Sequence, residues 1–492
     1  MDAATDNQKR WAELSAWGRE PELGELDALM WRTERPPANS WTGIVVQLFD
    51  VTPEWERVRR AHEWFLRLVP RFTERVVEPV LPVGTPMWSP DPDFDLGYHL
   101  RRVRLSAPGS IRQLLNYAQA QGLTPMDRSR SPWIGTLVEG LEDGRAAYVL
   151  QAHHVLMDGQ AVTQLLSRVL NRERAPVKSS STSSNGGAPQ RNEPGEQLAP
   201  LDVTARELTR QLQDTPHLLS AAWRTARRAA DNPRRAARYG ASLGRVLAPP
   251  PANPSKVLKG GSRRIWRFGM LECQLDELKA AGKAAGGTVN DTFVCILLGG
   301  LRRYCAHYGE DLGDVPISMP VAMRTADESM GGNKFAGAFF ACPSSIADPT
   351  SRIQEMRKRV EAVRSEPALD FLGNLTPVLN RTPGSLAAAL LGQINARSVL
   401  TTSSWPGVTE DLFIAGAQFE RMFVFAPLPG TTLTGAMCTH AGVCCIGINV
   451  DGSVIKEPEL LWRFMQESLD QVLALAPKTA VPPETASAAS KT

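Results

Sequence analysis

Two adjacent histidines, His153 and His154, are the residues of this 492-residue chain best suited to acid–base chemistry. They open the segment HHVLMDG, which ends in Asp158 and Gly159, in a chain that holds only seven histidines. The unperturbed pKa of imidazole lies near neutrality, so a positioned ring can take a proton from an alcohol as the alcohol attacks an activated acyl group. The segment therefore indicates an acyl-transfer site.

The elements around the histidine pair restrict which ring can do this. The apolar run 146–156 predicts a buried strand, and residues 159–170 predict an amphipathic helix. Neighbouring strand residues point to opposite faces, so the two histidines cannot both face one site. Gly159 leaves room for a thin ligand beside the backbone where the strand turns into the helix. Asp158 either forms an ion pair with an arginine or caps the helix.

Other interpretations of the pair remain open at this level. The two histidines could be buried core residues followed by an ordinary helix cap. A metal site is disfavoured because neither His nor Cys recurs nearby at ligand spacing. A serine hydrolase is disfavoured because no GxSxG segment follows a strand.

The length and the composition favour two domains of ordinary globular type. Hydrophobic residues make up 42% of the chain and charged residues 22%, and the formal net charge of +3 requires no nucleic-acid partner. Residues 171–200 are rich in Ser, Pro, Gly and Asn and predict a flexible linker. We therefore divide the chain into an N-terminal half (1–170), the linker, a C-terminal half (201–476) and a disordered tail (477–492).

Strands and helices are mixed on both sides of the linker. Residues 41–50, 315–324 and 443–454 predict strands, and the last of these ends in an Asp-Gly turn. Residues 287–308 predict a long helix that begins at Asn290 or Asp291. This alternation predicts two α/β halves, each a mixed sheet with helices.

Cysteine usage and the chain start bear on the compartment. The seven cysteines form no CxxC pair, and we expect them to be reduced, buried residues of a cytosolic protein. The first twenty residues have no apolar signal-peptide core, and no apolar run approaches the ~20 residues of a spanning helix. We expect a cytoplasmic protein whose membrane attachment, if any, is peripheral.

Beyond the histidine segment, the chain resembles the CoA-dependent acyltransferases with HHxxxDG, and most closely the bacterial wax ester synthase/diacylglycerol acyltransferases. The resemblance runs from about Glu25 to Leu475. It rests on five blocks: LDALMW near the start, LVPRFTERVV followed by DFDLGYHLRRVRL, DRSRSPWIGTLVEGLEDGRAAYVLQAHHVLMDG, TVNDTFVCILLGGLRRY and SMPVAMRTADESMGGNKFAGAFFACP. The third block is the most specific, because it places a PLW-type element, here Ser131-Pro132-Trp133, before the histidines.

The resemblance implies two chloramphenicol-acetyltransferase-like halves with the site in a tunnel between them. His154 would be the general base, Asp158 would be structural and Gly159 would clear the tunnel. The ND-type residues Asn290 and Asp291 would stand near the site or support it, or would only cap a helix.

Two further positions follow from the resemblance less directly. Trp133 fits packing better than chemistry, and Asn333 is a weaker match. The substrates would be an acyl-CoA and a diacylglycerol or long-chain alcohol, with no metal and no tightly bound cofactor.

The chain also departs from the family pattern. The family's C-terminal NVPGP appears here as SSWPGV, with Trp405 where a small apolar residue is usual and no asparagine, and Pro132 replaces the PLW leucine. The first change puts the acceptor side of the tunnel in doubt.

Two alternatives therefore stay open: a natural-product acyltransferase or condensation-type enzyme that uses the same HHxxxDG site, and a non-catalytic scaffold of this fold.

One charged segment fits two explanations. Residues 223–245 hold seven arginines and one acidic residue. They form either a basic surface for anionic lipid, at a membrane or a lipid droplet, or for the phosphates of coenzyme A, or else an ordinary solvated helix that Pro233 interrupts.

Overall fold

The structure is a computed structural model of the chain. It describes residues 14, 17–36, 39–82, 84–174, 196–247, 252–262, 265–322, 335–343, 345–368, 371–395 and 397–477. Asn333, residues 175–195 of the predicted linker and residues 478–492 of the predicted tail lie outside these ranges.

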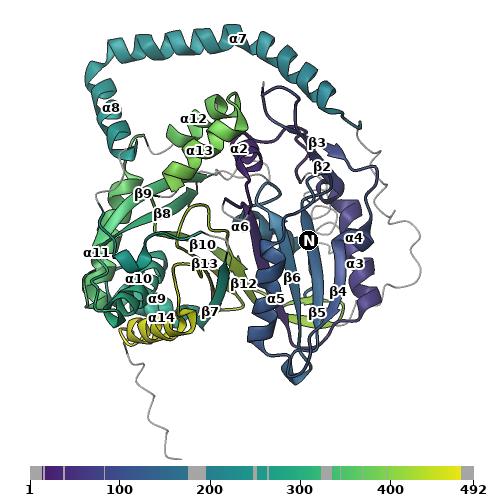
Figure 1. Cartoon of the computed structure of the whole chain (residues 1–492), viewed down its shortest axis with the longest axis vertical. Coiled ribbons are helices and arrows are strands. Elements are labelled where there is room, and N and C mark those ends of the chain that lie inside the picture. The colour runs from purple at the N-terminus through teal and green to yellow at the C-terminus, as the bar shows by residue number, and fades with distance from the viewer. Residues whose placement is uncertain are drawn as a thin grey trace, which may run out of the picture.

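Two six-stranded sheets form the two halves of the molecule (Figure 1). The first has the order β11-β12-β1-β6-β5-β4 and the second the order β7-β14-β13-β10-β8-β9. The strands of the first sheet are β1 (Thr42–Phe49), β4 (Leu100–Arg104), β5 (Trp133–Glu139), β6 (Ala146–His153), β11 (Leu412–Ile414) and β12 (Ala417–Phe425). Those of the second are β7 (Trp266–Gln274), β8 (Asp314–Ala322), β9 (Phe335–Pro343), β10 (Leu400–Val408), β13 (Leu433–His440) and β14 (Val443–Asp451). A separate hairpin pairs β2 (Glu74–Val77) with β3 (Met87–Pro90).

Helices pack around both sheets, and some of them also contact the opposite sheet. Those of the N-terminal half are α2 (Glu25–Thr33), α3 (Trp55–Leu68), α4 (Leu96–His99), α5 (Ile111–Leu123) and α6 (Gly159–Val169). Those of the C-terminal half are α9 (Leu275–Ala284), α10 (Val289–His307), α11 (Pro349–Arg364), α12 (Phe371–Asn380), α13 (Gly384–Asn395) and α14 (Pro458–Leu473). Helix α10 is apolar on nearly every side, and it is buried among α9, α11 and α14.

Most of the predicted elements are confirmed. The structure has strands β1, β8 and β14 where the sequence predicts them, and the Asp451-Gly452 turn follows β14. The start of α10 differs from the prediction. Its N-cap is Thr288, whose hydroxyl accepts a hydrogen bond from the backbone of Asp291, so Asn290 and Asp291 lie inside the first turn.

The N-terminal sheet is not built from residues 1–170 alone. Strand β12 crosses from the C-terminal part of the chain and pairs antiparallel with β1, so that Ile44 faces Phe425. The ring of Phe425 stacks on Phe268 of the other sheet, with ring centroids 4.1 Å apart. The N-terminal sheet therefore takes a strand from the C-terminal part of the chain, and the two sheets share an apolar core. The boundary predicted at residues 171–200 does not coincide with the boundary between the sheets.

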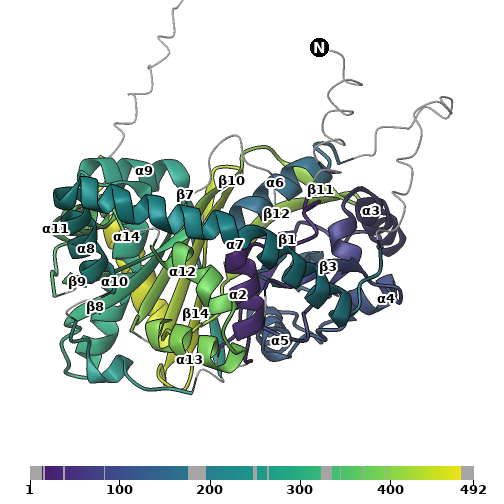
Figure 2. The ribbon, with the colours of Figure 1, turned by 90° about the horizontal axis from the view of Figure 1, so that it is seen from above.

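The described ends of the predicted linker are attached to the protein. Arg174 forms an ion pair with Asp50, and Leu198 is buried beside Val203 at the start of α7 (Pro200–Asp231). Helix α7 then runs over the top of the molecule from one half to the other, where α8 (Pro233–Leu247) begins (Figures 1 and 2).

Within the described part of the chain, no single helix is both long enough and apolar enough to cross a membrane. Only the bent pair α9 and α10, at 89° to each other, meets the length and composition of a span jointly.

Candidate active site

The HHVLMDG segment lies where β6 turns into α6. Strand β6 pairs with β1 up to His153, and the backbone N–H of the next residue, His154, donates to the carbonyl of Trp41 at 2.9 Å. Asp158 then caps α6, because its Oδ1 accepts from the backbone N–H of Ala161 at 2.8 Å. The ladder and the cap together fix the backbone of the histidine pair.

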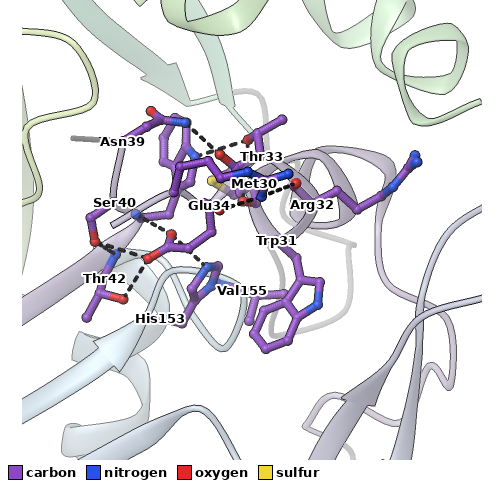
Figure 3. Close-up of polar contacts among 12 residues, drawn as sticks. Met30, Trp31, Arg32, Thr33, Glu34, Asn39, Ser40, Thr42, His153 and Val155 are labelled. Carbon is purple, nitrogen blue, oxygen red and sulfur yellow. Dashed lines mark hydrogen bonds and ion pairs between the residues drawn. The ribbon is translucent and has the colours of Figure 1, made fainter. Parts of the chain in front are cut away.

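His153 is locked into its own half of the molecule (Figure 3). Its ring is buried, its Nε2 lies 3.2 Å from a carboxylate oxygen of Glu34, and its Nδ1 accepts from the backbone N–H of Val155 at 3.0 Å. Because Nδ1 accepts a hydrogen bond, the ring proton of the neutral form is on Nε2, where it points at the carboxylate. Trp31 packs edge-on against the same ring, with centroids 5.1 Å apart.

Glu34 is a buried carboxylate that sequence reasoning missed. It follows α2, and it accepts hydrogen bonds from the backbone N–H of Trp41 at 2.6 Å and from the hydroxyl of Ser40 at 3.1 Å. Burial alone would raise its pKa, but the hydrogen bonds and the charge interaction with His153 outweigh burial and lower the pKa below its ordinary value. The only signal in the sequence was an acidic residue directly after an apolar helix, which many solvated helix ends share.

The contacts of His153 give the two histidines different roles. Both ring nitrogens of His153 face protein groups, so this ring has no lone pair directed at a substrate and holds the end of β6 against the segment around Glu34. His154 is half-buried and lies in the turn directly after β6. Its assignment as the general base stays a prediction.

A cavity of about 650 Å³ opens beside His153. Its walls come from the end of α2, residues 125–128, Pro132 and the start of α13, so both halves contribute to it. Trp31, Met126 and the prolines supply apolar surface, and arginines and acids stand among them. The histidine in its wall is His153, and His154 is not among its lining residues.

Gly159 faces the other half of the molecule. A Cβ atom placed on this glycine would lie 2.7 Å from Cδ2 and Cε2 of Trp405, closer than real Cβ contacts come. The sequence predicts that Gly159 clears a tunnel, and in this chain the indole of β10 occupies the space beside it. The departure SSWPGV is therefore in direct contact with the HHxxxDG turn.

The two ND-type residues have separate environments. The Oδ1 atom of Asn290 accepts from the hydroxyl of Ser404 on β10 at 2.7 Å, and its Nδ2 lies 3.6 Å from the sulfur of Met319 on β8. The side chain of Asp291 turns back to Thr288, accepting from its backbone N–H at 2.9 Å and its hydroxyl at 2.7 Å. Asn290 therefore joins α10 to two strands, and Asp291 completes a capping box.

Trp133 lies on β5 and pairs with Ala152, directly before the histidines on β6. Its indole is buried, donates to the carbonyl of Phe72 at 2.8 Å and stacks on His99 with centroids 4.9 Å apart. His62 also stacks on this indole, with centroids 6.5 Å apart, and burial lowers the pKa of that histidine. These contacts are those of a packing residue.

The structure thus brings Gly159 to Trp405 and Asn290 to Ser404, and it places Trp133 in the apolar cluster that holds Val155, Leu156 and Met157. Within the described residues, no group of three or more His, Cys, Asp or Glu side chains converges as metal ligands would.

Two models of one protein family together match almost the whole chain. Residues 23–293 match the wax ester synthase/diacylglycerol acyltransferase catalytic domain, and residues 331–472 match the C-terminal domain of the same family. A Mycobacterium tuberculosis protein named as a candidate diacylglycerol O-acyltransferase is 33% identical over 468 residues, covering 92% of each chain. Another protein of that organism with the same kind of name is 28% identical over 486 residues, covering 94% of this chain and 99% of its own.

Solved structures share the fold at lower identity. The wax ester synthase/diacylglycerol acyltransferase of Marinobacter aquaeolei VT8 superposes with a TM-score of 0.59 at 19% identity, covering 92% of this chain and 99% of that one. The first condensation domain of the calcium-dependent antibiotic synthetase gives a TM-score of 0.57 at 14% identity, covering 94% and 98%. The predicted pair of α/β halves is confirmed by these likenesses and by the two sheets.

Proposed function

Because the chain belongs to the wax ester synthase/diacylglycerol acyltransferase family, and is an acyltransferase, we propose that it moves a long-chain acyl group from acyl-CoA to the hydroxyl of a diacylglycerol or a fatty alcohol. The product would be a triacylglycerol or a wax ester. The observation that carries the proposal is the intact HHVLMDG turn, held between the two sheets with one histidine locked and the other half-buried.

The proposed step is direct acyl transfer with His154 as general base. The ring takes the hydroxyl proton as the alcohol oxygen bonds to the thioester carbon. The carbon–sulfur bond then breaks, and the CoA thiolate leaves and takes up that proton. A positioned base of this kind contributes about 10²–10⁴-fold to the rate.

The remaining acceleration would come from holding both substrates in one passage. His153, through Glu34, would keep the backbone of His154 in place, and Asp158 would do so from the helix side. The reaction balances without a metal or a bound cofactor.

The condensation-type alternative shares the fold at 14% identity, whereas both family models that match belong to the lipid branch. We therefore place the lipid reaction first. An assay with several acceptors separates the two alternatives.

Attachment to a lipid surface is a second part of the proposal. Helix α7 exposes Leu212 and Trp223, with 77% and 72% of their surface accessible, and Arg227 is exposed on the same helix. Large apolar side chains beside arginine suit the interface of an anionic membrane or droplet. Co-sedimentation with anionic vesicles, compared between the wild type and Trp223→Glu, tests this: equal binding would contradict it. The protein itself would be cytoplasmic.

The reaction is tested with purified protein and palmitoyl-CoA. CoA thiol release is followed with hexadecanol, with a diacylglycerol and with no acceptor, and the ester product is identified. We expect acceptor-dependent release that falls at least about 100-fold in His154→Ala.

His307→Ala, an exposed histidine on α10, is the matched control and should keep wild-type activity. Release that needs neither acceptor, or that is unchanged in His154→Ala, would refute the proposed reaction.

A further inference from the structure

The indole of Trp405 occupies the space that the glycine of the HHxxxDG turn leaves free. Its Cδ2, Cε2 and Cε3 atoms would lie 2.7, 2.7 and 2.8 Å from a Cβ at position 159. These atoms belong to the fused ring system, so the broad part of the side chain meets the start of α6. Alanine at position 405 would remove the fused ring and open this space, whereas the methyl group of an alanine at position 159 would clash with the ring.

Several contacts hold Trp405 in this place. Its backbone continues the parallel pairing of β10 with β13, opposite Cys438, and the pairing is interrupted between Trp405 and Val408. The preceding residue, Ser404, donates to Asn290 at 2.7 Å. The indole packs against the apolar core between the sheets. The ring is therefore fixed by the C-terminal half and directed at the N-terminal half.

The second sheet opens next to this residue. Strand β10 pairs with β8 only at Leu400 and Thr401, whereas β8 pairs along its whole length with β9. The side chain of Asn290 lies between the separating strands, with Met319 on one side and Ser404 on the other. Trp405 thus stands where the two halves meet and where the backbone pairing of β10 and β8 has ended.

The indole N–H of Trp405 is a hydrogen-bond donor without an acceptor among the described residues. Its Nε1 atom is buried. A buried donor without a partner is costly, and most such groups have a specific explanation. Nε1 is bonded to Cε2, one of the two atoms nearest Gly159, so this N–H lies beside the HHxxxDG turn.

We propose that Trp405 is a substrate-contacting specificity residue: its ring limits the passage beside Gly159 to one unbranched alkyl chain, and its Nε1–H donates to a substrate oxygen. This inference rests on the proposed acyl transfer. The alkyl chain belongs either to the acyl donor or to the alcohol acceptor. A wide acceptor such as a diacylglycerol would be disfavoured relative to a linear alcohol.

The test compares the wild type with Trp405→Ala, which opens the space, and Trp405→Phe, which keeps an apolar ring and removes the N–H. The value of kcat/KM is measured for hexadecanol and a diacylglycerol with palmitoyl-CoA. It is also measured for palmitoyl-CoA and a branched acyl-CoA with hexadecanol. We expect Trp405→Ala to raise the relative use of the wide substrate at least about tenfold in one series.

Each series identifies a different path. A change confined to the alcohols places the ring on the acceptor path, and a change confined to the acyl-CoAs places it on the donor path. Trp405→Phe should alter selectivity less and lower kcat/KM for the linear substrates about 2- to 10-fold, the effect of one lost hydrogen bond. Trp405→Phe also tests the role of Trp405 if the alanine variant does not fold.

Two results separate this inference from the proposed function. If the folded variants are active and both selectivity ratios stay within about twofold of the wild type, the role of Trp405 is refuted and acyl transfer stands. If the wild type turns over no acceptor, acyl transfer is refuted, and calorimetric titration with decanol and decanoyl-CoA decides the remaining question. Unchanged affinities in Trp405→Ala would then refute the contact as well.

Discussion

Two dipeptides lie in opposite halves of the molecule: His153-His154 at the end of β6, and Asn290-Asp291 at the start of α10. In each pair the two residues make different contacts. His153 is bound to Glu34 within its own half, and Asp291 is bound to Thr288 within its own helix. Asn290 instead reaches a neighbouring strand. In both pairs one residue secures the local backbone, and in the second pair its neighbour reaches another strand.

The difference between the two pairs lies in what secures them. Asp291 is held by contacts three residues away, which any helix start can form. His153 is held by a carboxylate from a distant part of the chain, which lies 3.2 Å from its Nε2 and accepts hydrogen bonds from three other residues. The histidine pair therefore depends on the tertiary fold far more than the ND pair does.

The comparison predicts its largest stability effect at Glu34. Replacing Glu34 by alanine leaves a buried histidine and several donors without their acceptor, so the free energy of unfolding should fall by about 3–5 kcal/mol. Urea denaturation followed by circular dichroism measures this. Glu34→Gln, which keeps the shape and can still accept from Trp41, should lose less.

Acid provides the control for this prediction. The folded pKa of Glu34 is lowered, so its contribution to stability is complete above about pH 4.3, the ordinary pKa of a glutamate, and is lost as the pH falls through the folded pKa. The difference in the free energy of unfolding between the wild type and Glu34→Gln should shrink as the pH falls through the folded pKa. A difference that stays constant with pH would contradict the assigned contact between the Glu34 carboxylate and His153.

A smaller effect is expected at Asp291. Asp291→Ala removes the acceptor for both donors of Thr288 and should lower the free energy of unfolding by about 1–3 kcal/mol, with kcat of the folded protein little changed. Asn290→Ala is the matched variant in the same turn. It should cost about 0.5–1.5 kcal/mol but lower kcat more, because β10 and Trp405 lose their link to α10.

If Asp291→Ala and Asn290→Ala changed kcat equally, the proposed difference between a capping role for Asp291 and a linking role for Asn290 would be refuted. Thermal unfolding and steady-state rates of both proteins, measured side by side, provide the comparison.

Much of the fold was predictable because its elements carry local patterns. The apolar run before the histidines, the helix after them and the long helix α10 all lie where periodicity places them. Strand β12 was not predicted, and no local pattern could have assigned it to the sheet of the other half. Pairing partners depend on packing among segments that are distant in sequence.

By itself, the sequence determined the family, the two α/β halves and the segment that carries the histidines, since residue types and spacings are local properties. Only the tertiary structure decided that Glu34 fixes His153, that Asn290 reaches β10 and that Trp405 covers Gly159. Each of these contacts joins residues far apart in the chain, and such contacts form only when burial brings their elements together.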